Sequence, residues 1–340
     1  MTEQVAFRHH QSAHCESGVT SNLLRNSGLP LSEAMAFGIG SGLFFLHVPW
    51  IKVMGLPITS YRSFPGTIFK KTCRRIGVPF EYKRFADPLK GTRALDAHLT
   101  GNRAVGIQSN IYWLSYIPEQ FRFQFNAHNL VVYGKNADGS FNVSDPVLEG
   151  VSVCPAQAMT KARFAKGMLA PKGLIYFPKP NGGVKTLSEL PMEKAVRTAI
   201  RETVNRMLYS PIPWAGVRGI RFLARRLTKL ESVVPNLDDQ KLEVANIVRM
   251  QEEIGTGGAG FRFLYAAFLQ EAGELLDDED LRESAVAMTN AGNLWRDFAT
   301  TAAKFCKGRS EQPFREMSDQ LLKIASAEEK IFSNLRRNYL

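Results

Sequence analysis

The 340-residue sequence has few cysteines and no long apolar run. Its four cysteines stand at positions 15, 73, 154 and 306, a spacing that suits neither a metal site nor a disulfide framework. The longest apolar stretch, at 38–48, is interrupted by glycines and is too short to cross a membrane. The N-terminus lacks the basic and apolar regions of a secretory signal. We therefore expect a cytoplasmic protein with no membrane contact, no metal and no cofactor.

Acidic residues are scarce in the first half of the chain. Residues 1–183 hold 20 Lys and Arg against 10 Asp and Glu, whereas residues 184–340 hold 23 against 22, so the net charge of +11 lies almost wholly in the first half. The basic residues gather in one stretch, which includes Lys70, Lys71, Arg74, Arg75, Lys83 and Arg84. Such a patch attracts an acidic partner, although a solvated helix face has the same composition. No zinc finger, helix-turn-helix or ribonucleoprotein motif supports nucleic acid as that partner.

Length and hydrophobic periodicity predict two domains, because 340 residues exceed one ordinary core. Residues 1–183 alternate helices and strands, which predicts an α+β domain. Its antiparallel sheet is expected to contain strands near 104–108, 129–134, 141–144 and 174–178. Residues 184–340 carry long windows with apolar residues three and four positions apart, which predicts an all-helical domain. The Pro-Asn-Gly-Gly stretch at 180–183 is the expected boundary.

The stretch at 9–18 places a cysteine at the start of a predicted helix. Val19, Leu23 and Leu24 recur at helical spacing and an Asn-Ser-Gly stop follows, which predicts a helix over 15–26. Cys15 lies in its first turn. Unpaired backbone N–H groups and the positive end of the helix dipole favour a thiolate there, the form that attacks carbonyls and thioesters. The alternative is that Cys15 is a small apolar core residue.

A histidine and an aspartate flank a predicted β-hairpin. His128 begins a buried apolar strand, Asp145 follows the next strand, and a turn at 136–139 joins the two. Antiparallel pairing across this turn brings His128 close to Asp145, which is the arrangement of a base and its orienting carboxylate. Taken singly, His128 suits a structural histidine and Asp145 a turn. Only together with Cys15 do they predict a catalytic triad.

These residues resemble a known family. The resemblance to the butirosin biosynthesis protein H family rests on the His-Cys-Glu-Ser at 14–17, the segment 31–38, the His128 strand and the Ser-Asp-Pro at 144–146. It extends to the second half through 255–258 and 261–265. The hairpin is also similar to that of the bacteriocin-leader peptidases of the papain class.

The resemblance implies a papain-like core followed by a helical domain. It also implies transfer of an acyl group from a carrier-protein thioester to an amine through an acyl-cysteine. In that mechanism Cys15 is the nucleophile, His128 the general base and Asp145 the orienting carboxylate.

The oxyanion donor departs from the papain pattern. Papain-type peptidases keep a glutamine six positions before the cysteine, where this sequence has His9. We expect the backbone N–H of Cys15 to serve, since helix-start amides point toward the nucleophile. The other oxyanion and pocket candidates are Gln11, His14, Glu16 and Tyr112. Tyr112 belongs to an aromatic stretch at 111–116, for which core packing is the alternative role.

Three classes of function remain open at this point. The first is an acyltransferase of secondary metabolism that takes its acyl group from an acyl carrier protein or another thioester donor and gives it to a small amine. The second is a cysteine peptidase or amidase, with water as the acceptor. A non-catalytic binding module would leave the triad unexplained, and self-association is left open. The glycine-rich stretch at 255–260 has the spacing of a dinucleotide loop, but it follows a predicted helix rather than a strand, which favours a tight helix connection.

Overall fold

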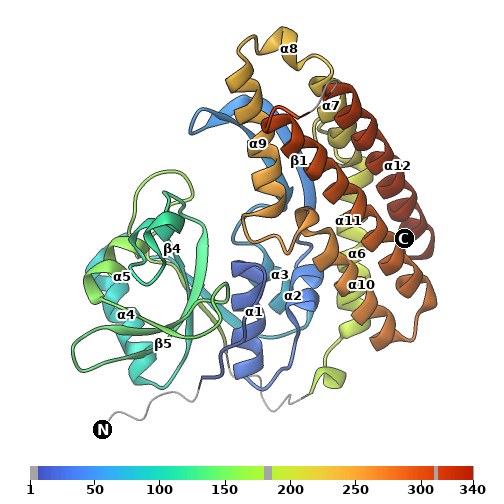
Figure 1. The fold of residues 1–340 in the computed structure, drawn as a ribbon. Helices are drawn as coiled ribbons and strands as arrows, with labels where there is room; N and C mark the ends of the chain where they lie inside the picture. The colour runs from blue at the N-terminus through green and yellow to red at the C-terminus, as the bar shows by residue number, and fades with distance from the viewer. Residues whose placement is uncertain (1–6, 180–185, 310–312, 340) are drawn as a thin grey trace. The chain divides into compact units, whose positions relative to one another are not determined.

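The computed structural model describes residues 7–179, 186–309 and 313–339 (Figure 1). The chain forms two compact units. Unit 1 comprises Met1–Ala36 and Pro65–Met192, and unit 2 comprises Phe37–Phe64 and Glu193–Leu340. The stretch at 180–183, where the sequence predicts a domain boundary, lies outside the described residues.

Unit 1 has the mixed α/β composition expected from its sequence. Its helices are α1 (Cys15–Asn26), α3 (Ile68–Arg75), α4 (Pro88–Thr100) and α5 (Ala156–Arg163), with short 3-10 helices η1 (Ile111–Trp113), η2 (Glu119–Phe121) and η3 (Leu187–Glu189). Its strands are β3 (Phe80–Lys83), β4 (Val105–Ser109), β5 (His128–Lys135), β6 (Phe141–Ser144), β7 (Ser152–Cys154) and β8 (Ile175–Pro178). Helix α2 (Glu33–Ile39) begins in unit 1 and ends in unit 2. Its start is capped by Ser32, whose Oγ accepts the Met35 N–H at 3.0 Å.

The six strands of unit 1 form one antiparallel sheet in the order β3-β8-β4-β5-β6-β7. The predicted antiparallel sheet is thereby confirmed, and β3 and β7 are added to it. Ile107 of β4 pairs with Leu130 on one side and with Ile175 on the other. Strand β8, the last strand of unit 1 along the chain, therefore lies inside the sheet and not at its edge.

The two faces of this sheet pack against different helices. Ile107, Leu130 and Val132 lie in a buried cluster with Leu95 of α4 and Met159 of α5. Because side chains alternate along a strand, their neighbours in β4, β5 and β8 point to the opposite face. That face packs against α1, which contacts β4, β5 and β8. The N-terminus of α1 lies at the start of β5, where the sulfur of Cys15 is 3.9 Å from Nδ2 of Asn129.

Gly106 allows a bulky ring on the α1 face. A Cβ added at Gly106 would lie 2.5 Å from the ring of Tyr176, closer than any side chain tolerates. Glycine at this position of β4 lets the fully buried Tyr176 of β8 lie across the neighbouring strand.

Unit 2 consists of helices and one β-hairpin. The hairpin pairs β1 (Leu43–Val53) with β2 (Leu56–Arg62) in a sheet of its own. The helices are α6 (Met192–Tyr209), α7 (Gly216–Leu227), α8 (Leu230–Val233), α9 (Leu237–Glu252), α10 (Arg262–Leu276), α11 (Glu279–Cys306) and α12 (Pro313–Tyr339), with the 3-10 helix η4 (Ala259–Phe261) before α10. The helical C-terminal region is confirmed. Strand β1 lies within residues 1–183, where the sequence predicts the α+β domain, but it belongs to unit 2 and not to the main sheet.

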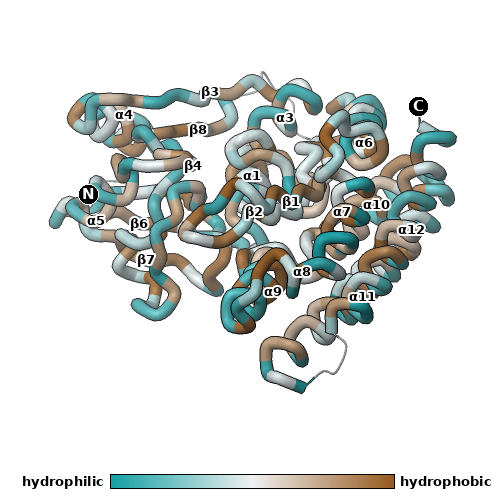
Figure 2. The backbone as a smooth tube through the Cα atoms, turned by 90° about the horizontal axis from the view of Figure 1, so that it is seen from above, coloured by the Kyte–Doolittle hydropathy of each residue, from teal (hydrophilic) through white to brown (hydrophobic). Residues whose placement is uncertain are grey.

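The helices of unit 2 pack through amphipathic faces. Helices α10, α11 and α12 lie side by side (Figure 1), and α11 and α12 alternate between hydrophobic and hydrophilic residues along their length (Figure 2). The hairpin joins this core because Phe45 and Tyr61 both contact the buried Trp295 of α11, with ring centroids 5.7 and 5.2 Å from it. Among the described residues, no helix is both long enough and apolar enough to cross a membrane.

The glycine-rich stretch connects α9 to α10. It follows a helix, so the expected tight connection is confirmed and the dinucleotide-loop interpretation is not supported. Its glycines at 255, 257, 258 and 260 all have positive φ. The backbone there turns in a way that side chains rarely permit.

Candidate functional site

The start of α1 is fixed by a buried carboxylate. Glu33 accepts the backbone N–H groups of Ala13 and His14 at 2.9 and 2.8 Å and the hydroxyl of Ser17 at 3.0 Å. Burial raises the pKa of Glu33, and these three donors oppose the rise. The ring of His14 caps the helix by accepting the Ser17 N–H at 3.3 Å. Cys15, which is 9% exposed, is thus held at the first position of α1.

The predicted hairpin brings His128 and Asp145 together. Strands β5 and β6 are antiparallel, with Val131 opposite Ser144, so the start of β5 lies near the end of β6. Nε2 of His128 lies 2.6 Å from Oδ2 of Asp145. Asp145 is fully buried and His128 is 4% exposed. A charged pair so deep in the protein needs further hydrogen bonds to offset its lost hydration.

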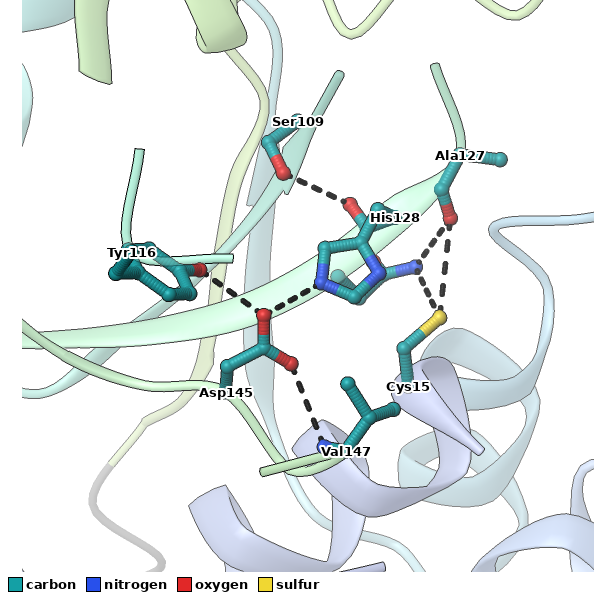
Figure 3. Close-up of polar contacts among 8 residues, drawn as sticks. Cys15, Ser109, Tyr116, Ala127, His128, Asp145 and Val147 are labelled. Atoms are coloured by element: carbon teal, nitrogen blue, oxygen red, sulfur yellow. Dashed lines mark hydrogen bonds and ion pairs between the residues drawn. The ribbon is translucent and has the colours of Figure 1, made fainter. Parts of the chain in front are cut away.

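Two other donors supply those hydrogen bonds to Asp145. The hydroxyl of Tyr116 donates to Oδ2 at 2.9 Å, and the backbone N–H of Val147 donates to Oδ1 at 3.4 Å. Figure 3 shows the carboxylate between Tyr116 and the imidazole of His128, with the imidazole between Asp145 and the thiol of Cys15. The carboxylate is therefore fixed from three sides, and Nε2 of His128 is committed to it.

The segment before Cys15 runs along the segment after β6. The N–H of Ser12 donates to the carbonyl of Pro146 at 2.7 Å, and Nδ1 of His9 lies 2.7 Å from Oγ of Ser144. A Cβ at Gly18 would lie 2.6 Å from the Cβ of Ser12 and 2.8 Å from that of Pro146. Only glycine permits this contact. The approach joins the helix that begins at Cys15 to the loop that carries Asp145.

The sulfur of Cys15 faces β5. It lies 4.0 Å from the carbonyl oxygen of Ala127 and 3.9 Å from Nδ2 of Asn129. Burial lowers the pKa of the neighbouring His128, but the Asp145 carboxylate and the Cys15 sulfur outweigh burial and raise it to about 10. The Asp145 carboxylate therefore favours the protonated form of the imidazole. The structure brings Cys15, His128 and Asp145 into one cluster within unit 1.

The other predicted site residues have separate surroundings. Glu16 is 1% exposed, and its carboxylate accepts the N–H groups of Gly66 and Ile68 at 3.1 and 2.8 Å, so it holds the start of α3. Gln11 is exposed. The ring of His14 caps α1 instead of facing a substrate space.

Tyr112 lines a surface hollow between η1, η2 and the first turns of α5. This hollow of about 440 Å³ is also lined by Trp113, Glu119, Arg122 and Lys161. Tyr112 is 43% exposed and packs edge-on against Trp113, with ring centroids 5.0 Å apart. The lining of the hollow contains none of the three triad residues.

Several residues of the cluster were not singled out from the sequence. Tyr116, Asn129 and Tyr176 all bond within it, and Glu33 holds the entry to α1. A signal existed for Asn129, because a polar residue inside an otherwise apolar buried strand needs a partner. Tyr176 gives no comparable signal. Among the residues that the structure describes, no group of three or more His, Cys, Asp or Glu is arranged to hold a metal ion.

Two family models match the chain. Residues 14–146 match the model of the butirosin biosynthesis protein H N-terminal region. This matched segment contains Cys15, His128 and Asp145. Residues 157–335 match a domain of unknown function, DUF4872. No curated protein matches the chain. On the match over residues 14–146, the chain belongs to the butirosin biosynthesis protein H-like family.

Proposed function

We propose that the protein is a cysteine-dependent acyltransferase that serves an antibiotic-type biosynthetic pathway, as the name of its family suggests. It would move an acyl group from a carrier-protein thioester to a small amine. One observation carries this proposal: a cysteine at a helix start faces a histidine that is bonded to a buried aspartate. That arrangement is how proteins activate a sulfur nucleophile.

In the first half-reaction, the Cys15 thiolate attacks the carbonyl carbon of the thioester. A carbon–sulfur bond forms to Cys15, the bond to the donor sulfur breaks, and the donor thiolate takes the proton of the His128 imidazolium. The backbone N–H of Cys15 is available to the oxyanion, because the first residue of a helix has no intrahelical acceptor. The products are acyl-Cys15 and a free donor thiol.

In the second half-reaction, the amine attacks acyl-Cys15. His128, now neutral, takes the proton that the amine loses, and Cys15 leaves as the thiolate. Asp145 keeps Nε2 of His128 engaged at 2.6 Å, so Nδ1 is the ring nitrogen left for proton transfer. The imidazolium–thiolate pair is then restored.

The layout of unit 1 supports a papain-like core for this chemistry. The nucleophile lies at the start of α1, α1 packs against an antiparallel sheet, and the histidine and aspartate lie on neighbouring strand ends of that sheet. Helix and hairpin are separated in sequence by about a hundred residues, and the contact between Ser12 and Pro146 fixes them together.

A cationic cluster supports an acidic carrier as the donor. Nζ of Lys70 lies 4.6 Å from the ring centre of Tyr82, the guanidinium of Arg84 lies 5.7 Å from the same ring, and Arg74 lies 5.8 Å from the ring of Phe80. Burial, and then the nearby Arg74 and Arg84, lower the pKa of Lys70. The three cations are therefore close enough to repel one another. An anionic surface would relieve that repulsion.

A cysteine peptidase or amidase is the second candidate, since the same triad also activates water as acceptor. Product analysis separates the two. The protein is incubated with a butyryl thioester of N-acetylcysteamine, with and without a panel of primary amines such as ethanolamine and glycinamide. Butyrylated amine that requires Cys15 supports transfer. Butyric acid alone, formed equally with and without amines, supports hydrolysis. If no turnover depends on Cys15, the remaining interpretation is a binding module.

A further inference from the structure

Asn129 occupies the buried side of the Cys15 sulfur. It follows His128 in β5 and is 4% exposed. Its Nδ2 lies 3.9 Å from Sγ of Cys15 and donates to the carbonyl oxygen of Ala127 at 2.9 Å. Its Oδ1 accepts the hydroxyl of Tyr176 at 2.8 Å. The side chain is therefore bonded at both ends.

These partners fix which way the amide points. A carbonyl oxygen only accepts hydrogen bonds, so Ala127 must face the NH2 group of Asn129 and not its oxygen. One amide hydrogen is used on Ala127. The second is left for the sulfur of Cys15, whose distance of 3.9 Å suits a hydrogen bond to sulfur.

Besides His128, the sulfur has one neighbouring group suited to each of its protonation states. A neutral thiol can donate its hydrogen to the carbonyl of Ala127, 4.0 Å away, but thiols are weak donors. A thiolate can accept the hydrogen of the Asn129 amide, and hydrogen bonds to charged groups are worth about twice those between neutral groups. An amide hydrogen of Asn129 is therefore positioned to bond the thiolate.

We propose that the Asn129 amide stabilises the Cys15 thiolate and that Tyr176 orients this amide. The proposal rests on the proposed role of Cys15 as nucleophile. Asn129 acts on the attacking sulfur itself, from the face packed against β5. Tyr176 acts through Asn129, and its ring stacks on Tyr82 at 5.8 Å, so its hydroxyl is held in place.

The test is the rate at which iodoacetamide alkylates Cys15 between pH 5 and pH 10. Asn129→Leu keeps a similar shape and removes the donor. The variant loses a hydrogen bond to a charged group, so alkylation at pH 6 should slow about tenfold or more, and its pH midpoint should rise by about one unit. At pH 10 the rates should converge, because the sulfur is then ionised in both proteins. Tyr176→Phe should give a smaller shift in the same direction.

Asn142→Ala is the matched control. Asn142 is also a buried asparagine of this sheet, at 7% exposure, but it bonds to Asn136 in the hairpin turn. Its variant should match the unmodified protein at every pH. A loss that is equal at all pH values for Asn129→Leu would mean a purely structural role and would overturn the proposal, as would an unchanged profile.

Two features of the experiment keep its result interpretable. If Asn129→Leu fails to fold, Tyr176→Phe carries the test, because it keeps the ring and removes only the hydroxyl. Alkylation needs no acyl donor, so it reports on Asn129 even if no thioester acylates Cys15. Conversely, acylation of Cys15 with an unshifted alkylation profile in both variants would leave the proposed function standing and remove the role of Asn129.

Discussion

Nε2 of His128 lies 2.6 Å from Oδ2 of Asp145, and the hydroxyl of Tyr116 donates to the same oxygen at 2.9 Å. This shared oxygen joins three segments of unit 1: the start of β5, the end of β6 and the loop after η1. Asp145 and His128 are buried and Tyr116 is partly buried, and an incompletely bonded carboxylate would be costly in such surroundings. Tyr116 therefore helps to hold the Asp145 carboxylate in the proposed triad.

The four cysteines should differ sharply in reactivity. Burial raises the pKa of Cys73, raises that of Cys154 to about 12, and raises that of Cys306. Cys15 lies at a helix start beside the imidazole of His128, whose pKa is raised by Asp145. At pH 6.5, substoichiometric iodoacetamide should label Cys15 first, as peptide mapping would show. Even labelling, or labelling led by another cysteine, would remove Cys15 as the nucleophile.

Substitutions in the triad should have graded effects on acylation of Cys15. His128→Ala should lower the rate by about 10²-fold to 10⁴-fold, the usual contribution of a general acid–base. Asp145→Asn should lower it less, and Tyr116→Phe by about tenfold at most, because one hydrogen bond to the carboxylate is lost. Stopped-flow release of the donor thiol measures the rate.

Tyr133→Phe is the matched control for Tyr116→Phe. Tyr133 is partly exposed and stacks on Phe7 at 5.1 Å, away from Asp145. Its variant should retain the full rate. General base catalysis by His128 would have to be abandoned if His128→Ala acylated Cys15 at close to the normal rate while remaining folded.

The His128–Asp145 pair should make stability depend on pH. Burial lowers the pKa of His128, but Asp145 and Cys15 raise it from 6.5 to about 10. A raised pKa means that the folded state binds the proton more tightly than the unfolded state. The contribution is then fully present below pH 6.5 and is lost as the pH rises toward 10. Urea unfolding is measured for Cys15→Ala and for the double variant Cys15→Ala/His128→Ala. The difference in their free energies of unfolding isolates the contribution of Asp145 to the pH dependence.

The free-energy difference between those two variants should shrink above pH 6.5 by at most about 1.4 kcal/mol per pH unit. His98 provides a control of opposite sign, because burial and Arg103 lower its pKa. His98→Ala in the same Cys15→Ala background should show no such loss above pH 6.5. A constant difference for His128 across the range would mean that Asp145 does not hold an imidazolium.

The cationic cluster should matter only for a carrier-bound donor. Exposed charges are screened over roughly 8 Å at physiological salt, so added salt should slow acylation by an acidic acyl carrier protein and leave a small thioester almost unaffected. Arg74→Glu and Arg84→Glu should mimic high salt for the carrier alone. Arg225→Glu, an exposed arginine of α7, is the control. If both donors acylate Cys15 equally more slowly, these arginines support the fold or line the site. If the rates with both donors are unchanged, the proposal that the cluster docks a carrier protein is wrong.

Local patterns predicted much of the fold. The helix expected at 15–26 is α1 (Cys15–Asn26), because apolar spacing and an Asn-Ser-Gly stop specify both of its ends. The expected hairpin is β5 and β6, joined by a tight turn. The helical windows after residue 186 were also predicted, since three-and-four spacing is a strong signal over long segments.

Contacts between distant segments could not be predicted. The position of β8 between β3 and β4 depends on pairing across some 70 to 95 residues, for which one sequence gives no signal. The hairpin of β1 and β2 belongs to unit 2 because Phe45 and Tyr61 pack on Trp295, far along the chain. For the same reason, Tyr116 and Tyr176 emerged as site residues only from their three-dimensional contacts.

The most direct test of the account is the intact mass of the protein after brief exposure to a butyryl thioester, either of an acyl carrier protein or of N-acetylcysteamine. We predict a mass increase of one butyryl group, mapped by peptide analysis to Cys15, absent in Cys15→Ala and removed by an added amine. A protein that stays unmodified with both donors, or that carries the acyl group on another residue, would contradict the acyl-Cys15 intermediate.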